Sequence, residues 1–183
     1  MSRRNLIVMA CGALLLGTAP ALAVDTAAVP TDPQIAATVV AANQADIDAA
    51  KVATSRTKNQ DVKEFAETMI RDHESVNKQA KDLVKKLKVK PEENATSKSL
   101  EQGGKENVAS LKKLHGTAFD KAYVDHEVTY HRQVLDEINS SLLPSAKNPE
   151  LKALIEKVTP AFQAHLDHAK KLQSELSSMG AAR

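Results

Sequence analysis

Apolar residues recur three and four positions apart along most of the chain, the spacing that lines one face of an α-helix. The pattern predicts long helices over residues 33–53, 59–87, 118–142 and 150–177. Asp32 is placed to cap the first helix and Pro33 to open it. Pro91 and Pro144 fall between the periodic segments, where proline ends a helix. We therefore expect an all-α fold, a four-helix bundle whose helices turn their apolar faces inward.

The lengths of the connections predict the topology. Short links join the first helix to the second and the third to the fourth, so each pair should form an antiparallel hairpin. The stretch Lys90–Thr117 is much longer and predicts a crossover along the bundle. It contains Gly103 and Gly104, and then a short apolar helical pattern around Leu111. We expect a short helix within this crossover.

Polar side chains interrupt the apolar faces near the middle of each bundle helix. His73, His131 and His165 lie on three helices and Asp46 on a fourth. The midpoints of packed helices share one level whether neighbours run in the same or in opposite directions, so these side chains should meet in one layer. Polar groups in such a layer are costly to bury unless they form hydrogen bonds or bind something.

The layer has the composition of a metal site. Imidazole and carboxylate groups are ligands for iron, zinc, manganese and copper. Glu127 lies four residues before His131 on the same helix face, so both can reach one point. The predicted ligands are Asp46, His73, Glu127, His131 and His165, and the predicted supporting residues are Asp72, Asp120, Tyr123 and His168. Asp72 points about 100° away from His73 and could orient a ligand or pair with a neighbouring helix.

A structural layer is the alternative, because buried histidines and acids can hydrogen-bond one another and fix the helix register. The Glu-x-x-His pair of di-iron bundles is absent, since Ile70, Val128 and Phe162 stand three residues before the histidines. Two functions remain open. The first is a non-catalytic envelope binding or stress-related protein with a structural layer, and the second is a metal-binding or redox bundle.

The first 23 residues have the pattern of a cleaved export signal. Two arginines precede an apolar run over residues 6–16, and Ala21-Leu22-Ala23 has the small-x-small form of a signal-peptidase site. We expect cleavage after Ala23 and a periplasmic mature protein. A lipid on Cys11 is the alternative. The mature chain would then consist of a loose leader at 24–32, one bundle domain at 33–177 and a flexible tail at 178–183.

Charge and composition argue against nucleic acid as a partner. The chain has 25 Lys and Arg against 23 Asp and Glu, and removal of Arg3 and Arg4 with the signal leaves 23 of each. There is no Trp, and three Phe and two Tyr offer few rings for base stacking. Cys11 lies inside the signal, so thiol chemistry is not expected, and nucleophile-elbow and phosphate-loop motifs are absent. Without a second apolar run we expect no integral membrane segment, which leaves an envelope protein or a second copy of the chain as a partner.

Three sequence elements resemble a known family. They are the string MIRDH at 69–73, the string FDKAY at 119–123 with His131 downstream, and Pro160 with His165. Together they resemble the exported bacterial proteins grouped as domain of unknown function 4142, often labelled predicted outer membrane proteins, over residues 32–176. The resemblance implies a ferritin-like four-helix fold and an envelope location, and it implies no established activity. The acid of the first helix is commonly Glu in that family, whereas this chain has Asp46.

Overall fold

The computed structural model describes residues 29–181, and the expectations for the export signal and for residues 24–28 of the leader lie outside that range. The described chain is all-α, as predicted, with no strand in this range. Its elements are α1 Asp32–Arg56, α2 Gln60–Leu87, α3 Ala95–Leu111, α4 Gly116–Glu137, the π-helical turn η1 Ile138–Leu142, α5 Leu143–Ser145 and α6 Pro149–Ala181.

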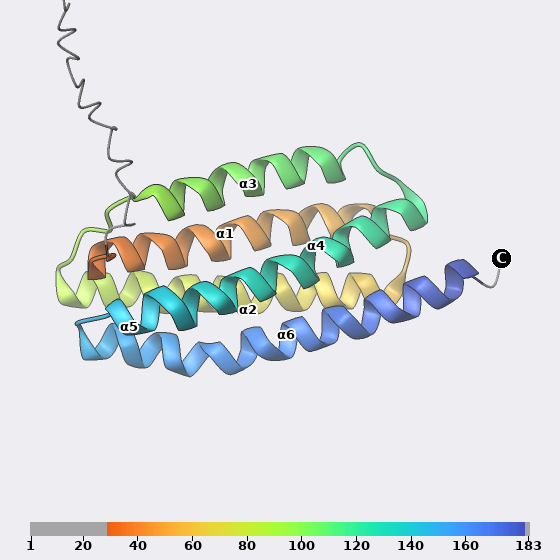
Figure 1. The fold of residues 1–183 in the computed structure, drawn as a ribbon. Helices are drawn as coiled ribbons and strands as arrows, with labels where there is room; N and C mark the ends of the chain where they lie inside the picture. The colour runs from red at the N-terminus through yellow and green to blue at the C-terminus, as the bar shows by residue number, and fades with distance from the viewer. Residues whose placement is uncertain (1–28, 182–183) are drawn as a thin grey trace, which may run out of the picture.

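The bundle is built from two hairpins joined by a crossover (Figure 1). α1 and α2 form one hairpin, and α4 and α6 form the other through η1 and α5. α3 runs back along α1 on the outside of the bundle, so α2 and α4 point in the same direction. This is the single long crossover of ferritin-like bundles. None of the described helices is both long enough and apolar enough to cross a membrane.

Asparagine side chains cap the starts of two of the bundle helices. Asn59 accepts hydrogen bonds from the amides of Asp61 at 2.9 Å and Val62 at 3.2 Å, which caps α2. Asn148 caps α6 in the same way. The N-cap of α1 is Thr31, one residue before the predicted Asp32. The Asp32 carboxylate instead accepts from the amides of Lys147 and Asn148 at 2.8 and 2.9 Å, so it ties the start of α1 to the loop before α6.

The crossover helix is longer than the sequence predicted. α3 covers 17 residues, and Gly103 and Gly104 lie inside it rather than in a loop. A Cβ atom at Gly104 would lie 2.7 Å from the Cβ of Ala45 and 3.2 Å from its Cα, whereas a Cβ at Gly103 would meet nothing within 4 Å. Gly104 therefore lets α3 approach the alanine-rich face of α1 closely.

The second hairpin also departs from the prediction in detail. The helix predicted over 118–142 is α-helical to Glu137 and widens into η1 at Ile138–Leu142. Pro144 lies within the short α5 that follows. α6 contains Pro160, as did the helix predicted over 150–177, and it remains helical to Ala181 where a flexible tail from residue 178 was expected. Figure 1 shows α6 bent in its N-terminal half.

Candidate metal centre

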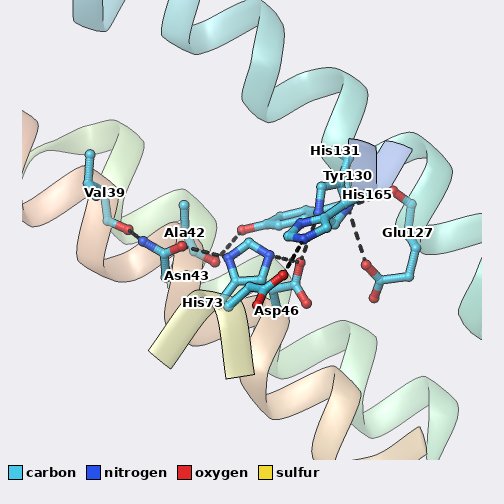
Figure 2. A network of polar contacts seen from close by, with 10 residues as sticks. Val39, Ala42, Asn43, Asp46, His73, Glu127, Tyr130, His131 and His165 are labelled. Carbon is cyan, nitrogen blue, oxygen red and sulfur yellow. Dashed lines mark hydrogen bonds and ion pairs between the residues drawn. The ribbon is translucent and has the colours of Figure 1, made fainter. Parts of the chain in front are cut away.

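The four bundle helices bring the five predicted ligands into one buried layer (Figure 2). α1 supplies Asp46, α2 supplies His73, α4 supplies Glu127 and His131, and α6 supplies His165. Each of these residues is at most 6% exposed. The centroids of the three imidazole rings are 5.3 to 5.6 Å apart. The sequence predicted this convergence from helix midpoints for Asp46, His73, His131 and His165 and from the four-residue spacing to His131 for Glu127; their role as metal ligands stays a prediction.

The hydrogen bonds of Asn43 determine which nitrogen of His73 carries the proton. Asn43 Nδ2 donates to the carbonyl of Val39 at 2.8 Å, which assigns the amide orientation and leaves Oδ1 facing His73. That oxygen lies 2.6 Å from His73 Nδ1 and can only accept, so Nδ1 must be the donor. In the neutral ring, Nε2 of His73 then has a lone pair and points into the layer.

The other two histidines are held in the same manner. His131 Nδ1 lies 3.1 Å from the carbonyl oxygen of Glu127, an acceptor, so Nδ1 donates. His165 Nε2 lies 3.0 Å from Asp72 Oδ2. Burial raises the pKa of Asp72, but contacts with Arg71 and His165 lower it by more, so Asp72 is ionised. The Asp72 carboxylate therefore accepts a hydrogen bond from His165 Nε2–H. The lone pairs of the neutral rings are therefore on His131 Nε2 and His165 Nδ1.

These inward nitrogens lie near carboxylate oxygens that have no hydrogen bond. Asp46 Oδ2 is 3.2 Å from His73 Nε2 and 3.5 Å from His131 Nε2. Neither contact has hydrogen-bond geometry, and among the described residues both Asp46 oxygens and all three inward nitrogens have no hydrogen-bond partner. Both Glu127 oxygens are also without one, although Oε2 lies 3.4 Å from His131 Nδ1. Native proteins leave few buried polar atoms unpaired, so such a cluster requires an explanation.

Two overlapping groups within the layer have metal-binding spacing. His73, His131 and His165 each offer a ligand atom within 4.8 Å of the others, and so do Asp46, Glu127 and His131. His131 belongs to both groups, which makes it the centre of the layer. Zinc bound by such ligands at 2.0–2.1 Å in a tetrahedron separates its ligand atoms by about 3.4 Å. The Asp46–His73 and Asp46–His131 distances, 3.2 and 3.5 Å, match that separation.

The layer favours one positive charge beside Asp46. Burial raises the pKa of Asp46, but the surrounding imidazoles outweigh it and hold that pKa at about 2. Burial, and then the charge of Asp46, raise the pKa of Glu127 to about 7. Burial opposes protonation of His131, but Glu127 and Asp46 raise its pKa to about 9. Burial lowers the pKa of His165 to about 4. In the absence of a metal, His131 therefore carries the balancing proton.

Of the four predicted supporting residues, two lie next to the layer and two lie away from it. Asp72 contacts His165 across the α2–α6 interface, and Tyr123 is fully buried one turn before Glu127. Asp120 and His168 require correction. Asp120 lies about 10 Å along the helix from Glu127, and its Oδ1 accepts from Thr57 in the α1–α2 link.

His168 is exposed and packs edge-on against Phe65, with ring centroids 5.1 Å apart. It follows His165 by three residues, which turns its side chain about 60° around the helix. This rotation carries His168 off the inward line of α6 and out of the layer.

Sequence reasoning missed the outer partners of the layer. Asn43 lies on the inward stripe of α1, three residues before Asp46, and its polar side chain on an apolar face was the available signal. Tyr130 donates from its hydroxyl to the carbonyl of Ala42 at 2.8 Å and closes the layer between α4 and α1. The ring of Phe162 lies 5.0 Å from that of His73. No sequence pattern marked Tyr130.

Comparisons with known proteins show the family and the fold. The sequence model of the family described as "Domain of unknown function (DUF4142)" matches residues 17–172. No curated protein matches the chain significantly. The crystal structure of a DUF305 fragment from Deinococcus radiodurans is similar, with a TM-score of 0.68 and 13% identity, over 78% of this chain and 95% of that chain. At this identity the likeness shows the fold alone.

Proposed function

We propose that this chain, which belongs to the family of domain of unknown function 4142, binds a divalent transition-metal ion in the core of its helical bundle. One observation carries the proposal. Three imidazole nitrogens without a hydrogen-bond partner face inward in the layer that holds a buried carboxylate, Asp46, and this carboxylate also has no hydrogen bond within the described residues. A buried carboxylate needs a positive charge beside it, and a metal ion that displaces the His131 proton would supply that charge and bond the inward nitrogens.

The outer hydrogen bonds support the same function. Metal-binding histidines almost always donate their second ring N–H to a carboxylate, a carbonyl or a similar acceptor, which fixes the tautomer and the ring direction. Here Asn43, the Glu127 carbonyl and Asp72 take these places for the three histidines. The outer acceptors therefore leave one inward nitrogen per ring, which is unprotonated in the neutral imidazole, for a ligand.

The donor set suggests the class of ion. Imidazole nitrogen suits zinc, copper, iron and nickel, whereas magnesium and calcium prefer oxygen alone. The distances from Asp46 to His73 and to His131 fit two edges of a tetrahedral ion's coordination. His165 would be a further nitrogen ligand, and ionised Glu127 would add a negative charge that offsets the charge of the metal ion.

The competing function is a non-catalytic binding protein whose layer is purely structural. Protonated His131 could then balance Asp46 without any metal. In that case a leucine at position 131, which suits the apolar stripe of α4, should be tolerated better than an alanine. An apolar cavity beside the layer favours a binding role.

Metal analysis of natively purified protein tests the proposal. Near-stoichiometric zinc, copper, iron or nickel should be present, and His73→Ala, His131→Ala or His165→Ala should remove it. His168→Ala is the matched control, because His168 is on the same helix as His165 but exposed. Metal-free protein that takes up none of Fe²⁺, Zn²⁺, Mn²⁺, Ni²⁺ or Cu²⁺ would contradict a metal function.

We propose in addition that the protein is exported to the periplasm. The arginines, the apolar run and the Ala21-Leu22-Ala23 sequence support this location. Intact mass of protein recovered from the periplasm should correspond to a chain that begins at Val24. A mass that retains Met1, or that includes lipid on Cys11, would contradict cleavage after Ala23.

A further inference from the structure

A cavity of about 440 Å³ lies inside the bundle, directly beside the candidate metal centre. Its walls come from the first half of α1, the second half of α2, the end of α4 with η1, and the first half of α6. The first half of α3 lines its outer side. The inner end of the cavity meets the layer at Asn43, Tyr130 and Phe162.

Small side chains and the π-helical turn account for the space. Ala36, Ala42 and Ala80 line the cavity at positions where a longer side chain would fill it. Ile138 and Leu142 at the two ends of η1 also line it, in the segment where α4 widens. Protein cores otherwise hold few voids larger than a water molecule, and π-helical turns occur often at functional sites.

The chemistry of the walls suggests the class of ligand. The inner surface is mainly aliphatic, with Val39, Val76 and Ile155 among its residues. Its polar atoms are already engaged, since Tyr130 donates to the Ala42 carbonyl and Asn43 bonds both Val39 and His73. Apolar cavities stay dry and accept apolar molecules.

The more exposed rim differs from the inner surface. Gln133 is exposed and Glu137 half-buried where the end of α4 borders the cavity, and Ser99 is exposed on the facing side of α3. The Glu137 carboxylate would repel an anionic head group, whereas a hydroxyl or amide could bond to these side chains. The rim therefore disfavours an anionic ligand, and the aliphatic interior disfavours a charged ligand of either sign.

The helix that covers the cavity is the least embedded of the long helices. Of the residues of α3 only Ser97 and Leu111 are buried, and they lie near opposite ends of that helix. Its first half, from Ala95 to Leu100, lies over the cavity. A ligand could therefore reach the interior by displacing a segment with few buried contacts.

We propose that this cavity binds one uncharged, largely apolar small molecule, with its body against Val39, Ile155 and Phe162 and its polar end toward Gln133 and Glu137. The volume falls within the range of 300–1,000 Å³ that is common for ligand pockets. The site is separate from the metal ligands, and Phe162 stands between them. The proposal does not require that the layer binds metal.

Fluorescence titration with N-phenyl-1-naphthylamine, an uncharged apolar probe, tests the site in chelated and in metal-supplemented protein. The wild type should show a saturable signal with one probe per chain in both samples. Ala80→Phe and Ala36→Leu, which fill the cavity from two helices, should each weaken binding at least tenfold. Ala109→Leu is the control, because Ala109 is exposed on α3 away from the cavity.

Circular dichroism melting separates loss of binding from loss of folding, and two filling variants keep the comparison available if one is unstable. Absence of saturation in the wild type would overturn the proposal. Equal binding by a folded filling variant would assign the signal to the surface and would also overturn it. One probe per two chains would place the site between two copies of the protein, again contrary to the proposal.

Discussion

At the scale of single residues, the orientation of the histidines depends on groups that bind no metal themselves. Asn43, the Glu127 carbonyl and Asp72 each hold the outer nitrogen of one imidazole. The five inward positions could be predicted because a polar residue on an apolar stripe is visible in the sequence. Their tautomers could not, because these depend on contacts such as that between Asp72 on α2 and His165 on α6.

Asn43 provides the sharpest residue test of this arrangement. Asn43→Leu removes the acceptor for His73 Nδ1 while keeping the branched heavy-atom skeleton of the side chain, so metal affinity should fall about 10- to 100-fold. Asn43→Asp retains an acceptor and should keep the affinity near that of the wild type. Competition against a chromophoric chelator measures both variants. A wild-type affinity in Asn43→Leu would show that His73 needs no orienting partner.

The pH dependence of the metal-free protein should reveal the proton on His131. Its pKa is raised from 6.5 to about 9 in the folded protein, so the folded state holds a proton that the unfolded state releases between those values. The stabilisation is complete below pH 6.5 and is lost as pH rises through 9, with a slope of up to roughly 1.4 kcal/mol per pH unit. Urea unfolding of chelated protein from pH 7 to 9 measures it.

The His131→Gln variant is the control for this titration, because glutamine binds no proton and the slope should flatten. The acid side is less informative, since two groups oppose each other there. The pKa of His165 is lowered to about 4, so the unfolded state binds the additional proton as pH falls below 6.5. The pKa of Glu127 is raised from 4.5 to about 7, so between these pH values the folded state binds a proton at Glu127 that the unfolded state does not. An unchanged slope in His131→Gln would contradict the assignment of the alkaline slope to His131.

At the scale of helices, the strongly periodic segments could be predicted and α3 could not. α2 and α6 have long apolar seams, and their start residues lie within one position of those expected. α3 buries only Ser97 and Leu111, so its sequence lacks an apolar stripe, and Gly103-Gly104 is typical of a loop. Its position depends on contact with α1, which is a tertiary effect.

The two adjacent glycines make a matched pair of test sites within α3. Gly104→Ala would place a Cβ 2.7 Å from that of Ala45 and should destabilise the protein by roughly 1–3 kcal/mol by forcing α3 away from α1. Gly103→Ala meets nothing within 4 Å and should stabilise the helix by roughly 0.5–1 kcal/mol. Urea unfolding measures both differences in free energy.

A second substitution shows whether the contact itself is responsible. Ala45→Gly removes the Cβ that Gly104→Ala would meet, so the double variant should recover much of the stability lost in Gly104→Ala. If Gly104→Ala were as stabilising as Gly103→Ala, the result would contradict a close contact between α3 and α1 at Gly104.

At the scale of the whole molecule, the layer and the cavity are placed so that both depend on the complete bundle. The five candidate ligands come from all four bundle helices, and the cavity adds α3 to its walls. The all-α class and the crossover topology followed from helix periods and connection lengths. The cavity did not, because its space results from how alanines and η1 meet in three dimensions.

A metal held by four helices should stabilise the whole fold against unfolding. The unfolded chain keeps none of the geometry among Asp46, His73, His131 and His165, so binding favours the folded state by mass action. At 100 times the dissociation constant the gain is about 2.7 kcal/mol, which corresponds to a rise in melting temperature of roughly 5–10 °C for a chain of this size. Circular dichroism melting with and without added Zn²⁺ measures the rise, and a chelator should reverse it. His73→Ala should show no rise, whereas the exposed-site variant His168→Ala should respond like the wild type. An equal rise in His73→Ala would place the metal outside the layer.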